Sequence, residues 1–209
     1  MSERVITSDA CVAEGVAWLC AHDEGMARAN AITGPLPLRL KPDGFGEVLS
    51  AIVSQQVSVA SANAIWAKLV AADLTSAPRI ATKTQDELRA VGLSRQKARY
   101  ALALAEAGID YDALRCAPTE TVIKTLTAVT GIGVWTAEIY AKFSLGRADV
   151  FASGDLALQE GAKLLYALPE RPKDKEVRKM AERWSPWRSV AARQLWAYYH
   201  VMKQRDGIR

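Results

Sequence analysis

The chain has 209 residues, half of them apolar and about a quarter charged, so it can bury a sizeable core in one large domain or two small ones. No apolar run approaches the roughly 20 residues that span a bilayer, and the first residues show no basic flank followed by an apolar stretch. We therefore expect neither a membrane span nor a secretion signal. The few, widely spaced cysteines argue against a disulfide framework and favour a reducing cytosol: Cys11, Cys20 and Cys116.

The first half of the sequence predicts one helix after another. Ser8 and Asp9 can cap a helix that runs to about His22, and Thr84 with Glu87 forms a capping box for a short one. Residues 23–44 are dense in proline and glycine and are predicted to connect helices. The other helices predicted in this half cover 45–54, 58–72 and 94–108, and the capping box opens the one at 84–92.

The second half continues this pattern, and no stretch alternates as a strand would. Helices are predicted at 118–129, after Gly133, and from about residues 155, 173 and 186. An all-α protein of roughly ten helices follows. We expect two lobes with a cleft between them, the first of about 1–44 plus 134–209 and the second of about 45–133.

Basic residues are concentrated near the C-terminus. The formal net charge is only +4, but residues 171–205 carry ten Lys and Arg against three acids. The rest of the chain has more acids than bases. An anionic partner would require such a stretch, although a solvated helical face would also produce it.

The most informative motif is a pair of glycines between two predicted helices, in the segment Thr130-Gly131-Ile132-Gly133-Val134. Glycines permit the backbone angles of a tight reversal and let another backbone approach closely. The amides at the start of the following helix would suit a phosphate group, with Thr136 beside them. The backbone carbonyls of Thr127, Val129 and Ile132 could turn the other way and hold a monovalent cation, Na⁺ or K⁺. An ordinary turn is the alternative for GxG alone, but the flanking LxxVxGIGxxTA pattern resembles the DNA-binding hairpin of helix-hairpin-helix glycosylases.

Asp155 is the acid that such a glycosylase would need downstream of the hairpin. It follows Gly154 and begins an apolar-periodic helix. As a base leaves its sugar, C1′ gains positive charge, and a carboxylate beside it stabilises that charge and can orient the attacking water. The simpler role of Asp155 is that of a helix N-cap, and the two roles can coexist. Asp149 is a weaker candidate because it precedes an apolar pair rather than opening a helix.

Three blocks together resemble the bacterial DNA-3-methyladenine glycosylase II family over roughly residues 35–203. These blocks are Ile52-Val53-Ser54-Gln55-Gln56-Val57-Ser58-Val59-Ala60, the hairpin through Ala137, and Ala181-Glu182-Arg183-Trp184-Ser185-Pro186-Trp187-Arg188-Ser189 with Trp196. The resemblance implies a DNA glycosylase of base excision repair that acts on alkylated purines such as 3-methyladenine and 7-methylguanine. No N-terminal β-domain is expected.

The resemblance also implies roles for single residues. Asp155 would be the catalytic acid. Trp135 stands where lyase-type relatives have a lysine, which implies a monofunctional enzyme that uses water and forms no Schiff base. Gln55 and Gln56 would supply the wedge that fills the gap left by the flipped base. The base pocket would contain two aromatic residues that attract cationic bases and two aliphatic residues where some members have tyrosines: Trp135, Trp196, Ile139 and Leu156. Core packing is the alternative for the tryptophans and is favoured for Trp184 and Trp187.

Ser94 and Lys97 open a further helix that could meet the backbone of the second DNA strand, or could simply be a capped surface helix. The expected partner is double-stranded DNA with damaged bases. We expect no membrane association, a monomer, no required cofactor, and a cytoplasmic protein associated with the bacterial nucleoid.

Three rival interpretations remain open. A non-catalytic helix-hairpin-helix DNA-binding module would give Asp155 no chemical role. A metal-dependent hydrolase or nuclease would have few ligands, since the histidines are His22 and His200. A glycosylase for another lesion, such as hypoxanthine, ethenoadenine or uracil, fits the same motifs.

Overall fold

The computed structural model describes residues 3–205, which form thirteen α-helices and one 3-10 helix. The only β pairing among these residues is an isolated bridge between Val5 and Arg147, so the predicted all-α class is confirmed. Residues 1–2 and 206–209, which the predicted first lobe includes, and the side chain of Arg205 lie outside the described residues. Within the described range, no helix has both the length and the apolar character that crossing a membrane requires.

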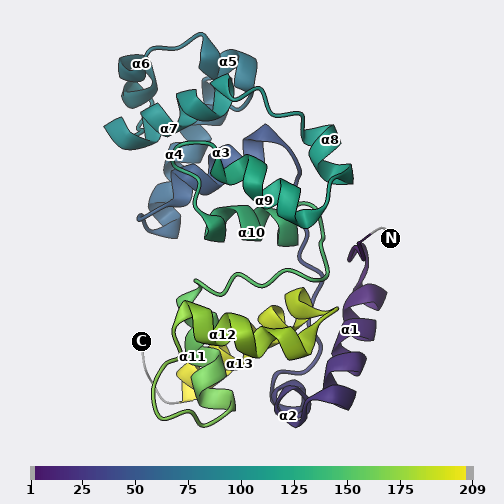
Figure 1. The fold of residues 1–209 in the computed structure, drawn as a ribbon. Coiled ribbons are helices and arrows are strands. Elements are labelled where there is room, and N and C mark those ends of the chain that lie inside the picture. The colour runs from purple at the N-terminus through teal and green to yellow at the C-terminus, as the bar shows by residue number, and fades with distance from the viewer. Residues whose placement is uncertain (1–2, 206–209) are drawn as a thin grey trace. The chain divides into compact units, whose positions relative to one another are not determined.

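The chain divides into two compact units. Unit 1 is Met1–Leu40 with Ala141–Arg209, and unit 2 is Lys41–Tyr140. In Figure 1 the purple N-terminal helices of unit 1 accompany its green and yellow C-terminal helices, because the chain returns to the unit in which it began. The predicted lobes follow the same path along the chain, and the cleft between them stays a prediction.

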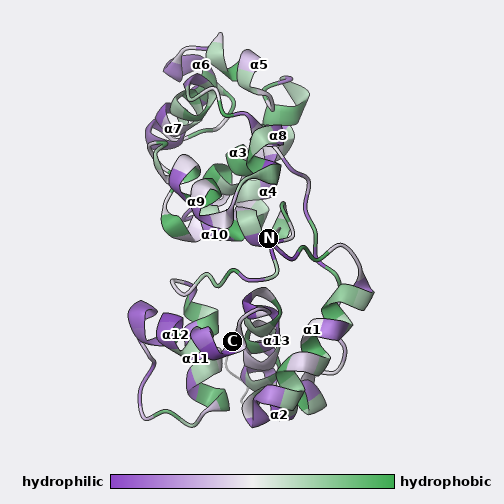
Figure 2. Cartoon of the chain, turned by 45° about the vertical axis from the view of Figure 1, so that its right-hand side comes forward, coloured by the Kyte–Doolittle hydropathy of each residue, from purple (hydrophilic) through white to green (hydrophobic). Residues whose placement is uncertain are grey.

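Unit 1 is built around its long last helix. Its elements are α1 (Asp9–His22), α2 (Glu24–Thr33), α11 (Leu156–Leu165), α12 (Asp174–Ala181), η1 (Glu182–Trp184) and α13 (Arg188–Arg205). Helix α13 packs against α1, α2 and α11, and at Gly161 the approach is so close that a Cβ would lie 2.6 Å from the Leu195 carbonyl oxygen. The outer helix α12 is mostly hydrophilic (Figure 2). Trp184 and Trp187 are 0% and 2% exposed, which confirms that both pack in the core.

Unit 2 contains the remaining helices: α3 (Phe45–Ser54), α4 (Val59–Ala71), α5 (Ala77–Ala81), α6 (Gln85–Ala90), α7 (Arg95–Glu106), α8 (Tyr111–Cys116), α9 (Thr119–Thr127) and most of α10 (Val134–Phe143). The caps expected from the sequence form as predicted. Ser94 accepts a hydrogen bond from the Lys97 amide, and Thr84 and Glu87 complete their capping box. A buried apolar core that includes Leu49, Leu88 and Leu126 lies inside the unit.

The prediction that residues 23–44 only connect helices is wrong, because α2 occupies 24–33. The side chain of Asp23 caps this helix by accepting from the Met26 amide at 3.1 Å, and Gly34 ends it in the left-handed region. Met26 and Ala29 bury its apolar side. The short helices α5 and α8 were not predicted either, since five or six residues show too little periodicity.

Asp23 also ties together three segments that are distant in the sequence. Its carboxylate accepts from Trp184 Nε1 at 2.9 Å and from Tyr166 Oη at 2.9 and 3.0 Å, and Arg183 lies 3.9 Å away. Burial alone would raise the pKa of Asp23, but the hydrogen bonds and the Arg183 charge outweigh burial and lower it. The ionised carboxylate is therefore a structural centre of unit 1.

We predict that Asp23→Ala lowers the free energy of unfolding by about 2–4 kcal/mol, because Trp184 and Tyr166 lose a buried acceptor. Since the folded-state pKa of Asp23 is lowered, its stabilising contribution is complete above the pKa of an unfolded aspartate, about 4, and is lost as the pH falls through the folded-state value. Urea unfolding at several pH values measures both effects. Asp112→Ala, whose side chain is 89% exposed, is the control. Equal stabilities of the two variants would contradict the structural role of Asp23.

Candidate functional site

The glycine hairpin joins α9 to α10 in unit 2. Gly131 has φ +97°, a conformation that L side chains rarely adopt, and the Ile132 amide donates to the Val129 carbonyl at 3.1 Å. Helix α10 then begins with exposed backbone and side chains. Val134 is 50% exposed, and a Cβ added at Gly133 would meet nothing within 4 Å. The start of α10 after Gly133 is thus open to a phosphate, whereas the Ile132 amide is already engaged and the Thr136 side chain is buried.

The packing of Tyr100 also requires a glycine at position 131. A Cβ at this position would lie 2.2–2.6 Å from ring atoms of Tyr100 on α7. The aromatic ring therefore rests directly on the hairpin backbone, and it fixes the hairpin relative to α7.

A polar pocket of about 380 Å³ lies beside this contact. It is lined by residues of three separate segments: Gln55, Gln56, Val57, Ser94, Gln96, Lys97, Tyr100 and Gly131. The Gln55 side-chain amide donates to the Gly131 carbonyl at 3.1 Å. Gln56 is exposed and has φ +55°, an uncommon conformation for a residue other than glycine. The residues predicted as wedge and as phosphate contacts, other than Gly133 and Thr136, thus share one pocket within unit 2.

Lys97 differs from the other lining residues because its ammonium group is already engaged. Its Nζ donates to the Val53 carbonyl at the end of α3 at 2.6 Å, and the residue is 9% exposed. Burial lowers the pKa of Lys97. The side chain holds α7 against α3, and its contact with DNA phosphate stays a prediction.

Asp155 lies in unit 1, where it is the N-cap of α11. One carboxylate oxygen, Oδ1, accepts from the Ala157 amide at 2.8 Å, and the Asp155 amide donates to the Ala152 carbonyl at 3.0 Å. The residue is partly exposed. Asp155 is therefore both a helix cap, as the simpler interpretation has it, and a carboxylate with a second oxygen to spare.

The loop before Asp155 is held by the start of α13. Arg188 pairs with Asp149 at 2.7 and 2.9 Å, and Ser185 Oγ donates to the same carboxylate at 2.8 Å. Burial would raise the pKa of Asp149, but Arg188 and Ser185 outweigh burial and lower it. The buried Ser189 hydroxyl contacts both the Arg147 and the Val150 carbonyl oxygens, at 2.6 and 2.9 Å. The Trp-Ser-Pro-Trp-Arg-Ser block thus serves as the scaffold of the Asp155 loop, and Asp149 belongs to that scaffold.

The four residues predicted for the base pocket are divided between the units. Trp135 is 44% exposed and Ile139 is partly buried, both on the part of α10 that belongs to unit 2. In unit 1, Leu156 is 59% exposed and Trp196 is partly buried. The Arg39 guanidinium lies over the Trp196 ring at 4.7 Å, and the His200 ring centroid is 3.9 Å from it. Trp196 is therefore paired with a cation within its own unit.

Sequence reasoning missed a group of cations around Asp155 in unit 1. Lys142, near the end of α10, and Arg193, on α13, are 4% and 6% exposed. Asp155 and Arg193 both influence the charge state of Lys142. Arg193 belongs to the basic C-terminal stretch and Lys142 does not, and no sequence signal marked either residue as buried.

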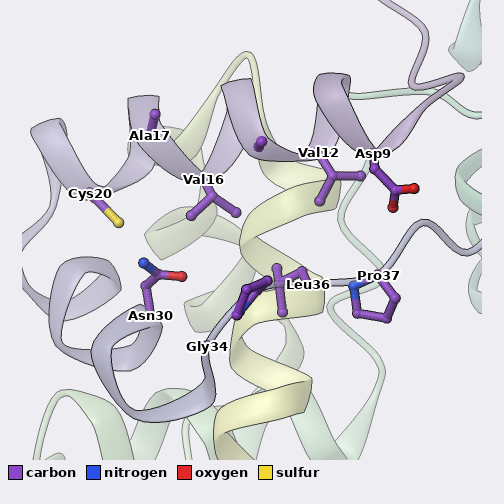
Figure 3. A pocket seen from close by; sticks show the side chains of 11 residues that line it. Asp9, Val12, Val16, Ala17, Cys20, Asn30, Gly34, Leu36 and Pro37 are labelled. Atoms are coloured by element: carbon purple, nitrogen blue, oxygen red, sulfur yellow. The ribbon is translucent and has the colours of Figure 1, made fainter.

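A second pocket, about 740 Å³ and mostly apolar, lies in unit 1 between α1 and the segment that follows α2 (Figure 3). Val12, Val16 and Leu36 point into it. At its edge the Asp9 carboxylate accepts from the Leu38 amide at 2.8 Å and so holds this segment against α1. No motif in the sequence predicted this pocket.

Comparison with known proteins identifies the family to which this chain belongs. Residues 49–186 match the model of the HhH-GPD superfamily of base excision DNA repair proteins. DNA-3-methyladenine glycosylase 1 of Schizosaccharomyces pombe is 30% identical over 207 residues, which cover 93% of this chain and 89% of the relative.

Two solved structures agree with this match. The DNA-3-methyladenine glycosidase of Bacillus halodurans superposes with a TM-score of 0.82 at 33% identity, over 96% of this chain and 94% of that one. The Schizosaccharomyces pombe 3-methyladenine DNA glycosylase in complex with abasic DNA gives a TM-score of 0.73 at 30% identity, over 88% and 95% of the two chains. The resemblance stated from the motifs is thereby confirmed, and the chain belongs to the HhH-GPD superfamily of base excision DNA repair proteins.

Proposed function

We propose that this protein is a monofunctional DNA glycosylase that hydrolyses the N-glycosidic bond of alkylated purines, such as 3-methyladenine and 7-methylguanine, in base excision repair. The observation that carries the proposal is the Asp155 carboxylate, which is fixed through one oxygen at the start of α11 in a chain of this family. The names of the relatives, which are 3-methyladenine glycosylases, support the substrate class.

The chemistry requires a negative charge beside the sugar. When the bond between C1′ and the base breaks, its electron pair leaves with the base, and C1′ becomes positively charged. Asp155 stabilises that charge through the oxygen not bound to Ala157, and it orients the water that attacks C1′ and then loses a proton. Hydrogen bonds of the Asp155 loop keep the carboxylate in place, so little reorganisation accompanies the reaction.

Water, rather than a lysine, is the proposed nucleophile. The resemblance implies that Trp135, which is 44% exposed, stands where lyase-type relatives carry the attacking lysine. We therefore expect release of the free base and an intact abasic strand, without a covalent protein–DNA intermediate.

DNA would be held chiefly by the hairpin of unit 2. The exposed start of α10 that follows Gly133 would meet a phosphate, and the polar pocket beside Gly131 presents Gln56 as the wedge that replaces the flipped base. The hydrogen bond between Gln55 and the Gly131 carbonyl ties wedge and hairpin together, so both would engage the duplex as one body. The DNA complex solved for the Schizosaccharomyces pombe relative supports this role.

A monovalent cation at the hairpin carbonyls of Thr127, Val129 and Ile132 remains part of the proposal. The Val129 carbonyl already accepts one hydrogen bond, from Ile132, and each carbonyl oxygen has two lone pairs, so the donor set fits a weakly held Na⁺ or K⁺. The ion would supply positive charge beside the phosphate site. The monomeric state and the cytoplasmic, nucleoid-associated location also remain predictions.

We predict that Asp155→Asn lowers single-turnover release of 7-methylguanine from duplex DNA by about 100-fold or more. Asparagine caps a helix as well as aspartate does, so the stability of α11 is retained while the negative charge is lost. Asp110→Asn is the matched control, because Asp110 caps α8 through the same type of bond at 2.9 Å. Equal release by wild type and Asp155→Asn would remove the mechanism and favour a non-catalytic DNA-binding module.

We also predict that Gly131→Ala weakens binding to DNA with an abasic-site analogue by about tenfold or more, since the new Cβ would displace the Tyr100 ring and distort the hairpin. Fluorescence anisotropy measures the dissociation constant. Gly108→Ala, at φ +58° with nothing within 4 Å, carries the backbone strain without the clash and should bind normally. Normal binding by Gly131→Ala would show that the hairpin does not anchor DNA.

A further inference from the structure

Two cationic side chains of unit 1 are buried, and one of them, Arg193, lacks hydrogen-bond partners among the described residues for two of its nitrogen atoms. Arg193 is 6% exposed, and its Nε and Nη1 atoms make no hydrogen bond within residues 3–205. Its Nη2 reaches the Arg39 carbonyl oxygen only at 3.5 Å. Lys142 is 4% exposed. Buried cations with unused donors are costly, so the cluster favours the arrival of an electron-rich group.

The protein compensates these charges only weakly. The Phe143 ring faces both cations, with its centroid 4.8 Å from Lys142 Nζ and 5.6 Å from Arg193 Cζ. Burial lowers the pKa of Lys142 to about 7; repulsion from Arg193 and Arg39 acts in the same direction, and the Asp155 carboxylate opposes it. Burial and repulsion from Arg39 also lower the pKa of Arg193, to about 10. Of the charges that act on Lys142, two are positive, those of Arg193 and Arg39, and one is negative, that of Asp155.

This field reaches the place where a base would leave. If Asp155 stabilises C1′, the base attached to C1′ lies beside the same carboxylate, whose charge acts on Lys142. Arg193 lies toward the predicted base pocket, because its Nη2 is 3.5 Å from the Arg39 carbonyl oxygen and the Arg39 guanidinium lies over the Trp196 ring. The Trp196 ring, which could otherwise attract a cationic base, already carries the Arg39 guanidinium at 4.7 Å. A base that arrives with a positive charge therefore gains less from these surroundings than a neutral base does.

The charge of the leaving base differs between two classes of lesion. A ring-methylated purine such as 7-methylguanine is cationic in DNA and becomes neutral when the electron pair of the C1′–N bond moves onto it. A neutral lesion such as hypoxanthine becomes an anion in the same step and takes its proton from water afterwards. Nearby cations stabilise that anion as it forms and provide no such help for the cationic base.

We propose that Lys142 and Arg193 are specificity-determining residues that shift excision toward neutral damaged bases and away from cationic methylated purines. The inference rests on the glycosylase function proposed above. It concerns the relative rates of two substrates at one site, and the two residues act through space on the departing base.

The preference should depend on pH in a defined direction. As the pH falls through neutrality, Lys142 gains a proton and the cluster becomes more positive, so neutral lesions gain relative to cationic ones. The other charged groups are Arg193, His200 and Lys203 on α13, Arg39, Asp155, and Glu138 one turn earlier on α10. Burial, Lys203 and Arg39 lower the pKa of His200 while Asp155 opposes them, so His200 would change the charge in the same sense. Variants of Lys142 are therefore needed to separate the effect of Lys142 protonation from that of His200 protonation.

The test measures single-turnover rates on matched duplexes that contain hypoxanthine or 7-methylguanine, with wild type, Lys142→Met and Arg193→Met. Methionine retains the apolar stem, so both variants are expected to fold. We expect each to lower the ratio of hypoxanthine to 7-methylguanine excision by about tenfold. Arg28→Met is the control, because Arg28 is an exposed cation of unit 1 whose guanidinium donates to the Leu165 carbonyl at 3.2 Å. On either side of neutral pH the ratio should change for wild type and much less for Lys142→Met.

The ratio separates this inference from the proposed function, because a general loss of folding or activity lowers both rates together. An unchanged or increased ratio in both variants, with release that still depends on Asp155, overturns the specificity role alone. Borohydride trapping of a covalent complex that requires Lys142 would also overturn it, since the lysine would then be a nucleophile. If wild type releases neither base, the proposed function fails and this inference fails with it.

Discussion

The hydrogen bond between Asp155 Oδ1 and the Ala157 amide decides how the Asp155 site can work. At 2.8 Å it fixes the carboxylate at the start of α11 and leaves Oδ2 for the proposed catalytic role. The bond satisfies one of the free amides of the helix start, so the structural and chemical roles of the residue support each other. The cap hydrogen bond restricts rotation of the carboxylate and so keeps its position fixed.

Residues around Asp155 in unit 1 hold the loop that carries this carboxylate. Arg188 binds Asp149, Ser189 holds the carbonyls of Arg147 and Val150, and Gln159 Nε2 donates to the Ser153 carbonyl at 2.8 Å. The tryptophans of the same block are buried and anchor α13 in the core of unit 1. In unit 2 the Tyr100 ring packs on Gly131 and holds the hairpin in place, as Ser189 holds the Asp155 loop in unit 1. Each half of the proposed chemistry is thus built inside its own compact unit.

Local signals explain which features could be predicted from the sequence. The helix that begins after Asp155, the capping box at Thr84 and the glycine reversal at Gly131 depend on neighbouring residues only, and all three form as expected. Helix α2 was missed because prolines and glycines later in the segment masked the cap at Asp23. The burial of Lys97 was readable in principle, since Ala101 and Leu104 follow it on one helical face, but its basic side chain suggested a surface contact. The burial of Lys142 and Arg193 could not be predicted from the sequence, because it arises from tertiary packing of segments that are distant in the chain.

The central claim is that Asp155 places a negative charge against a sugar carbon that becomes positive. A direct measurement compares the dissociation constants of duplexes that contain a cationic pyrrolidine or a neutral tetrahydrofuran in place of the damaged nucleotide. Wild type should bind the cationic analogue at least about tenfold more tightly, and Asp155→Asn should bind both alike, because the charge that distinguishes them is gone. A preference for the cation that persists in Asp155→Asn, or no preference in wild type, would contradict the role of this carboxylate.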